Sequence, residues 1–152
     1  MKLKKAPFLG VLLFLLATGC SPKAQVKWIS YTPEKMQEAI SSGQPVFAYF
    51  YAAWCHPCVQ LREHTFTDPR VIAALELYRR IKVDMSFIHS APVEKISETY
   101  RVNGMPTLIL FGPDGKEFYH QAGYMNADRL LKILQDFRHA YKLPEPAPPA
   151  AK

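Results

Sequence analysis

Residues 45–58 read PVFAYFYAAWCHPC, an apolar run that ends in two cysteines three positions apart. The aromatic and β-branched residues of positions 45–52 predict a central strand of a sheet that is covered on both faces. Cys55 and Cys58 therefore stand where this strand ends and a helix begins. Pro57 is compatible with that helix, because the first turn has no amide partner to lose. Two thiols on one face of a helix start suit thiol–disulfide exchange.

Strand and helix signals alternate around this segment. Runs of β-prone residues predict strands at residues 26–31, 45–52, 78–85, 107–111 and 117–121. Capping residues and apolar residues at helical spacing predict helices from Pro33 to a stop at Gly43, from the cysteine pair to about His64, from Pro69 through Leu75, from Pro92 to Tyr100, and from a cap at Asn126 to Tyr141. This order predicts an α/β fold with a central mixed β-sheet and helices on both faces.

Residues 1–19 are typical of a secretory signal peptide. Three lysines among the first five residues precede the apolar run FLGVLLFLLA of residues 8–17. A membrane-spanning helix needs about 20 apolar residues, so this shorter run favours cleavage over an uncleaved anchor. The sequence LATGC of residues 16–20 resembles a bacterial lipobox. We therefore expect Cys20 to be lipidated and to hold the protein on a membrane.

Ordinary signal cleavage that leaves a free thiol at Cys20 is the alternative. A free thiol near a redox-active pair in an oxidising compartment would form wrong disulfides, which favours lipidation. Ser21, rather than an aspartate, follows the cysteine, and this resembles outer-membrane sorting of enteric lipoproteins. We expect a lipid anchor on the periplasmic side of a bacterial membrane, with the outer membrane favoured and a soluble periplasmic protein as the alternative.

The composition fits one soluble domain. The chain has 152 residues, of which 49% are hydrophobic and 21% charged. The formal charge is +6, and the leader carries three of the positive charges and no acidic residue. The remaining excess is too small to favour nucleic acid binding. The predicted organisation is a lipoprotein signal peptide at 1–19, a tether at 20–26, a domain at 27–141 and a disordered, proline-rich tail at 142–152.

Two motifs together resemble the thioredoxin superfamily. WCHPC follows an apolar strand, and GMPT follows about fifty residues later, before a strand and a hairpin. The chain is also similar to the C-terminal periplasmic thioredoxin-like domain of the disulfide reductase DsbD. That likeness is carried by YAAWCHPC at 51–58, HTFTDPRV at 64–71 and NGMPTLILFGPDGKE at 103–117.

The resemblance covers residues 27–141 and implies a thioredoxin-like fold. It implies a redox-active Cys55–Cys58 disulfide as the only cofactor, with no bound metal. It also implies that Pro106 is a cis-proline facing the cysteines. Met105 would then offer its backbone to an extended substrate.

The residues around the cysteine pair have separate expected roles. Cys55 is the attacking thiol, because a helix N-terminus stabilises negative charge. Cys58 is the buried resolving thiol, which closes on Cys55 and releases a mixed disulfide. His56 is expected to stabilise the thiolate and to raise the reduction potential between the values of thioredoxin (about −270 mV) and DsbA (about −120 mV). Trp54 is expected to shape the substrate-binding rim.

Two positions depart from the family pattern. Thioredoxins usually carry a buried aspartate six residues before the first cysteine, as proton acceptor for the resolving thiol, and here that position is Tyr49. A tyrosine with an ordinary pKa of about 10 is a poor base at neutral pH. The DsbD-like domain also has an acid where this chain has Ala53. We interpret Tyr49 as a core residue, so water or another group takes the proton, or resolution by Cys58 is slow.

The leading hypothesis is a periplasmic, membrane-tethered thiol:disulfide oxidoreductase of the protein-disulfide reductase type. Its expected partners are protein thiols and disulfides and a membrane electron donor, and it is expected to be a monomer. Pro57, placed as in thioredoxin, favours reduction. His56 slightly favours the alternative of a disulfide oxidase or isomerase. A further alternative is a zinc or copper(I) site on the two cysteines, although the five histidines are scattered without ligand spacing.

Overall fold

The computed structural model describes residues 25–149. The predicted signal peptide, Cys20 and most of the predicted tether lie outside these residues. The strands of the described chain are β1 (Ile29–Ser30), β2 (Val46–Tyr51), β3 (Arg79–Asp84), β4 (Thr107–Phe111) and β5 (Glu117–Ala122). Its helices are α1 (Pro33–Ser41), α2 (His56–Gln60), the π-helix η1 (Leu61–Thr65), α3 (Pro69–Leu75), α4 (Ala91–Tyr100) and α5 (Ala127–Ala140).

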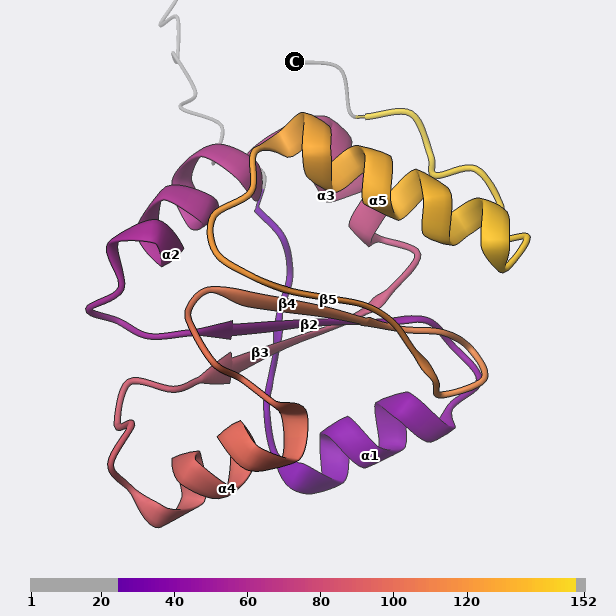
Figure 1. The fold of residues 1–152 in the computed structure, drawn as a ribbon. Coiled ribbons are helices and arrows are strands. Elements are labelled where there is room, and N and C mark those ends of the chain that lie inside the picture. Colours follow the sequence, from indigo (N-terminus) through magenta and orange to yellow (C-terminus); the bar gives the residue numbers. More distant parts are fainter. Residues whose placement is uncertain (1–24, 150–152) are drawn as a thin grey trace, which may run out of the picture.

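The strands form one mixed sheet, as the sequence predicts, and the structure gives their order as β1-β3-β2-β4-β5. β2 lies at the centre, parallel to β3 and antiparallel to β4. Tyr51 at the end of β2 pairs with Asp84 at the end of β3, and Phe50 pairs with Thr107 at the start of β4. The ends of two strands and the beginning of a third therefore meet at one edge of the sheet, at the left of Figure 1.

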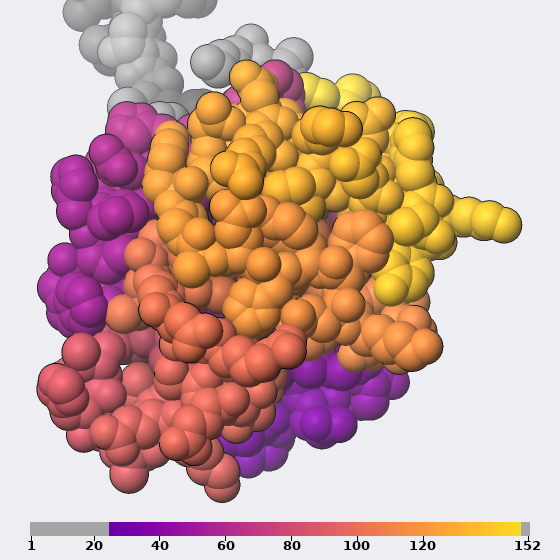
Figure 2. Space-filling view, viewed as in Figure 1, coloured from indigo at the N-terminus to yellow at the C-terminus, as the bar shows by residue number. Residues whose placement is uncertain are grey.

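Helices cover both faces of the sheet, which confirms the predicted architecture. α1 and α4 lie below the sheet in Figure 1, and α2, α3 and α5 lie above it. In the same view, β5 and α5 form much of the front surface (Figure 2). Because side chains alternate along a strand, Phe47 and Tyr49 of β2 enter the upper core and Ala48 and Phe50 enter the lower core.

Three of the helices begin with a capping side chain that the sequence predicts. The side-chain oxygens of Thr32, Asp68 and Asn126 accept hydrogen bonds from backbone amides in the first turns of α1, α3 and α5. These bonds satisfy amides that have no partner within the helix.

The first strand is shorter than predicted. Only Ile29 and Ser30 pair with β3, whereas the sequence predicts a strand over residues 26–31. The chain crosses from above the sheet to below it at this point (Figure 1). Val26 and Trp28 pack into the upper core, so only a short stretch runs alongside β3.

The helix after the cysteines also differs from a regular α-helix. It passes from α2 into the π-helix η1, which the sequence did not predict. Within η1, Leu61 and Thr65 are both buried. The Thr65 hydroxyl donates to the carbonyl oxygen of Met125 at 2.7 Å. The Thr65 hydroxyl thus joins η1 to the segment that precedes α5.

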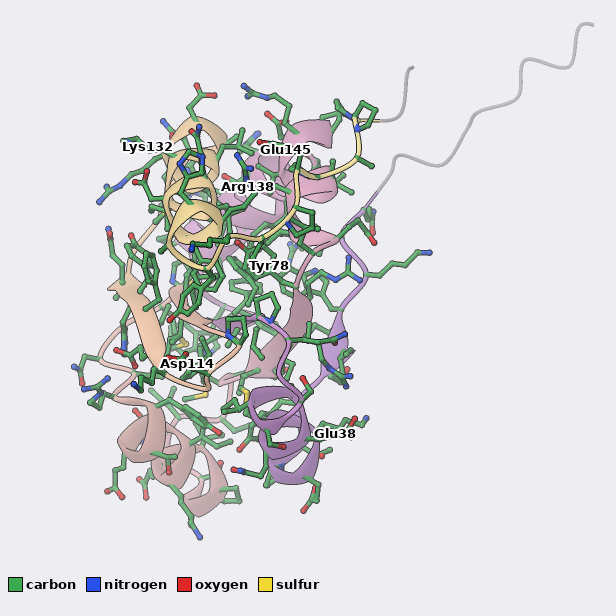
Figure 3. All side chains as sticks on the ribbon, turned by 90° about the vertical axis from the view of Figure 1, so that its right-hand side faces the viewer. Glu38, Tyr78, Asp114, Lys132, Arg138 and Glu145 are labelled. Atoms are coloured by element: carbon green, nitrogen blue, oxygen red, sulfur yellow. A yellow bond between two sulfur atoms is a disulfide. The ribbon has the colours of Figure 1, made fainter. Side chains whose placement is uncertain are left out.

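The C-terminal segment 142–149 contains no helix or strand, yet its first residues contact the domain. The Leu143 N–H donates to the carbonyl oxygen of Arg138 at 3.0 Å, and the Leu143 side chain packs against the upper core. Arg138 forms an ion pair with Glu145 near the end of α5 (Figure 3).

The end of α5 is also fitted to the turn between β4 and β5. Gly112 begins this turn, and its N–H donates to the carbonyl oxygen of Lys116 at 2.8 Å. The Tyr141 ring lies so close to Gly112 that any Cβ at this position would overlap it. The Tyr141 hydroxyl donates to Asp114 at 3.3 Å. The Tyr141 side chain therefore packs against the turn between β4 and β5.

Candidate active site

The two cysteines form a disulfide at the start of α2. Cys55 is the N-cap residue, in an extended conformation, and Cys58 lies within the first turn. Their Cα atoms are 5.2 Å apart. Both are buried, with 5% of Cys55 and 1% of Cys58 exposed. Only a narrow part of Cys55 is therefore open to solvent in this oxidised form.

An amide is aimed at the first sulfur. The backbone N–H of Cys58 donates to Cys55 Sγ at 3.2 Å and also lies 3.1 Å from the Cys55 carbonyl oxygen. In a reduced protein the same N–H would stabilise negative charge on Cys55 Sγ, because the amides at a helix N-terminus carry a partial positive charge. This arrangement suits the attacking role expected for Cys55.

A second loop closes over the pair. The Met105–Pro106 peptide bond is cis, as the resemblance implies. Pro106 is buried, and its carbonyl oxygen accepts from the Gly123 N–H at 2.7 Å. Met105 packs against the small cluster formed by Ala52, Cys55 and Cys58. Through Met105, the loop with the cis bond therefore lies against the disulfide, and the expectation that Pro106 itself faces the cysteines stays a prediction.

Tyr49 lies beneath the second cysteine. It is buried in the upper core, and its hydroxyl donates to the carbonyl oxygen of Cys58 at 3.3 Å. Burial raises the pKa of Tyr49 above its ordinary value, so the phenol is uncharged at neutral pH. This supports its interpretation as a core residue. The phenol contacts the backbone of Cys58 and holds the first turn of α2.

The residues before Cys55 are bound to the loop that follows β3. The Ala53 N–H donates to Ser86 Oγ at 2.8 Å. The Trp54 indole N–H donates to the Ser86 carbonyl oxygen at 2.9 Å, while 60% of Trp54 remains exposed. Asp84 in turn accepts from the Ser86 N–H at 2.9 Å and from the Ser86 hydroxyl. Trp54 is therefore a fixed, exposed aromatic beside the disulfide.

The described fold and site agree with a match to a family model of the thioredoxin-like domain, which covers residues 32–138. The chain belongs to the thioredoxin-like family. The matched range runs from the N-cap of α1 to the last turns of α5 and includes both cysteines and Pro106.

Relatives of this thioredoxin-like domain include thiol:disulfide interchange proteins. The DsbD protein of Campylobacter jejuni is 33% identical over 128 residues, which cover 84% of this chain and 22% of that protein. The chain spans about a fifth of the length of the curated relatives it matches.

Solved structures share the fold. The oxidised C-terminal domain of Neisseria meningitidis DsbD has a TM-score of 0.62 and 21% identity, covering 72% of this chain and 99% of that one. A thioredoxin from Thermus thermophilus has a TM-score of 0.60 and 25% identity, covering 74% of this chain and 87% of that one. Both confirm the thioredoxin-like fold.

The remaining expected residues of the thioredoxin-like site occupy its rim. His56 is exposed on the first turn of α2, and Pro57 beside it is half-buried.

Within residues 25–149, no three His, Cys, Asp or Glu side chains lie close enough together to hold a metal ion. No helix in this part of the chain is long and apolar enough to cross a membrane.

Two residues near the thioredoxin-like site escaped the sequence reasoning. These residues are Asp84 and Ser86. The Asp84 carboxylate accepts a hydrogen bond from the backbone N–H of Ser86, two positions later, which is a common turn in which an aspartate binds a nearby amide. That pattern predicts a turn only. Ala53 is more than thirty positions away in the sequence, so only the register between β2 and β3 brings it to Ser86.

Proposed function

We propose that this domain is a thiol:disulfide oxidoreductase that works on periplasmic proteins, mainly as a reductase or electron relay. The observation that carries the proposal is the Cys55–Cys58 disulfide at the start of α2, packed against the loop of cis-Pro106. The likeness to proteins named thiol:disulfide interchange protein DsbD supports it.

The proposed reaction begins from the reduced protein. The Cys55 thiolate attacks one sulfur of a partner disulfide, whose S–S bond breaks, and the released partner thiolate takes up a proton. The Cys58 thiol then loses its proton and attacks Cys55 Sγ. This step forms the Cys55–Cys58 disulfide and releases the second partner thiolate. Two electrons have moved to the partner, and a donor dithiol must return two electrons to the domain.

The buried position of Cys58 supports its role as the resolving thiol. Cys55 is more exposed than Cys58, and Met105 packs against the cluster that contains both cysteines. A partner disulfide would therefore reach Cys55 first. Met105 and the exposed Trp54 border this approach and are proposed to contact the substrate, and Pro106 shapes the same loop.

The proposed location rests on the sequence of the leader. LATGC at residues 16–20 supports lipidation of Cys20 after signal cleavage, which would tether the domain on the periplasmic side of a membrane. The expected measurement is the mass of the mature N-terminus with its acyl chains. A Cys20→Ser variant should move from the membrane to the soluble fraction, and an unchanged membrane fraction would argue against the anchor.

Activity is tested by the reduction of insulin disulfides with dithiothreitol as electron donor. Wild-type protein should accelerate the reaction, and Cys55→Ser should abolish the acceleration. Cys58→Ser, reduced first and then separated from dithiothreitol, should accumulate a mixed disulfide with insulin on Cys55. A wild-type protein no faster than dithiothreitol alone would refute the proposal. In cells, Cys58→Ser should trap physiological partners as covalent adducts that dithiothreitol releases.

A disulfide oxidase or isomerase is the second candidate, favoured by the exposed His56 next to Cys55. Equilibration with glutathione measures the reduction potential and separates the two. A value near that of thioredoxin, about −270 mV, indicates a reductase, and one approaching about −120 mV indicates an oxidase. His56→Ala should lower the potential if the imidazole stabilises the Cys55 thiolate, and an unchanged value would remove that role.

A further inference from the structure

We propose that Ser86 is a positioning residue that fixes the chain in front of Cys55 and thereby sets the reactivity of its sulfur. The inference rests on the proposed exchange activity and deepens it. It is carried by the position of the Ser86 hydroxyl, which joins the end of β3 to the residues that precede the disulfide.

The hydrogen-bonded pairing of β2 and β3 ends just before the cysteines. The last backbone bond between the two segments runs from the Met85 N–H to the Tyr51 carbonyl oxygen at 2.7 Å. Beyond it, the Ala53 N–H donates to Ser86 Oγ at 2.8 Å. The serine side chain therefore adds one more connection past the end of the sheet.

The Ser86 hydroxyl can make both of its bonds at once. A hydroxyl has one hydrogen to donate and two lone pairs to accept with. Its hydrogen goes to the Asp84 carboxylate, and a lone pair receives the Ala53 N–H. Because a carboxylate polarises the hydroxyl, the oxygen becomes a better acceptor for the amide. The serine N–H binds the same carboxylate at 2.9 Å, which fixes its backbone.

The connection acts on the residues that carry the reactive sulfur. On its far side, Cys55 is held by the first turn of α2, where the Cys58 N–H points at Cys55 Sγ from 3.2 Å. On its near side, three residues, Ala52, Ala53 and Trp54, separate it from the end of β2 at Tyr51. A bond at the Ala53 amide therefore limits how far Cys55 can move from the amide that stabilises its thiolate once the disulfide is open.

Trp54 gives Ser86 a second contact that can be separated from the first. The indole N–H donates to the backbone carbonyl oxygen of Ser86 at 2.9 Å. Every substitution of Ser86 retains this carbonyl oxygen. Ser86→Ala removes the hydroxyl alone, and Ser86→Thr keeps it. Ser90→Ala is the matched control, because the Ser90 hydroxyl belongs to the same loop but donates to the Phe87 carbonyl oxygen at 2.8 Å.

The experiment measures the second-order rate constant of the reduced protein with 5,5′-dithiobis(2-nitrobenzoic acid) at pH 7. Loss of one hydrogen bond at a solvent-accessible position predicts a rate about fivefold lower for Ser86→Ala. Ser86→Thr should stay within about twofold of wild type, and Ser90→Ala should match wild type. Amide hydrogen exchange provides the second readout: exchange at Ala53 should be about fivefold faster in Ser86→Ala, with exchange at Phe50 unchanged.

Several outcomes would overturn the inference while leaving the proposed function intact. An active wild type with a Ser86→Ala variant that reacts equally fast would do so. Equal losses in Ser86→Ala and Ser90→Ala would indicate a general effect of the loop. Unaltered exchange at Ala53 would show that the hydroxyl does not hold this amide. An inactive wild type would instead refute the proposed function itself.

Discussion

The two faces of the sheet are built from different side chains, although both are covered by helices. The upper core, beneath α2, α3 and α5, contains a connected set of aromatic rings, with Trp28 contacting Phe47, Tyr49 and Phe66 at centroid distances of 5.0–6.0 Å. The buried residues of the lower core, against α1 and α4, are mainly aliphatic, such as Ile81 and Val83.

The two cores also differ in how they contact the active site. The upper core reaches the cysteines through the Tyr49 hydroxyl, which binds the backbone of Cys58. Among the described residues, the buried members of the lower core make no such hydrogen bond to α2. We therefore expect substitutions in both cores to lower stability, and the loss of the Tyr49 hydroxyl in the upper core to alter Cys58 directly.

The largest effects are expected for Phe47→Ala and Phe50→Ala, a matched pair on opposite faces of β2. Both side chains are fully buried, so each truncation should lower the free energy of unfolding by about 3–5 kcal/mol. Urea denaturation measures both losses. The comparison would break if only one of the two variants were destabilised, because one core would then support the fold alone.

The next largest effect is expected at high pH, where the two buried tyrosines of the upper core should make the protein less stable. Burial raises the pKa of Tyr49 and Tyr78 above the ordinary value, so the unfolded chain releases these protons near pH 10 while the folded chain keeps them. The contribution of these two buried phenols to the free energy of unfolding is complete below about pH 10. It declines as the pH rises further, by up to about 1.4 kcal/mol per pH unit for each proton. On the other face, burial raises the pKa of Tyr100 to about 12.

Denaturation curves between pH 9 and pH 12 test this expectation. The double variant Tyr49→Phe/Tyr78→Phe should lose stability less steeply than wild type as the pH rises, although it is less stable at pH 7. An unchanged slope would mean that these two hydroxyls do not titrate differently in the folded and unfolded chains.

The smallest effect distinguishes the two buried tyrosines from each other. Each hydroxyl donates to a backbone carbonyl oxygen, Tyr49 to Cys58 at 3.3 Å and Tyr78 to Leu134 at 3.5 Å. Each Tyr→Phe change should cost about 0.5–1.5 kcal/mol at pH 7. Only Tyr49→Phe should change the rate at which Cys58 resolves a mixed disulfide, by about twofold to fivefold.

A stopped-flow measurement of mixed-disulfide decay with the two single variants checks this difference. Equal rates in Tyr49→Phe and wild type would mean that the hydroxyl serves the core alone. A matching change in Tyr78→Phe would mean that the rate reports general stability rather than the contact beneath Cys58.

Much of the fold follows from local patterns in the sequence. Thr32, Asp68 and Asn126 predict helix starts because a cap needs only an amide two or three residues away. The apolar run of β2 predicts a central strand because both of its faces are buried. The cysteine spacing and the resemblance also predicted the disulfide and the cis bond before Pro106.

The features that were not predicted depend on partners far along the chain. The π-helix η1 is joined to the rest of the fold by Thr65 bonding to Met125, sixty positions away. Ser86 reaches Ala53 across thirty-three positions, and Leu143 folds back onto the upper core. Periodicity and capping describe neighbours within a few residues, so they carry no information about such contacts.

The contact between Gly112 and Tyr141 has a consequence for how this domain can diverge. Because a Cβ at position 112 would overlap the end of the Tyr141 ring, a side chain there requires the ring to move or a smaller residue at position 141. Across homologous sequences, a side chain at position 112 should be found together with a smaller residue at position 141.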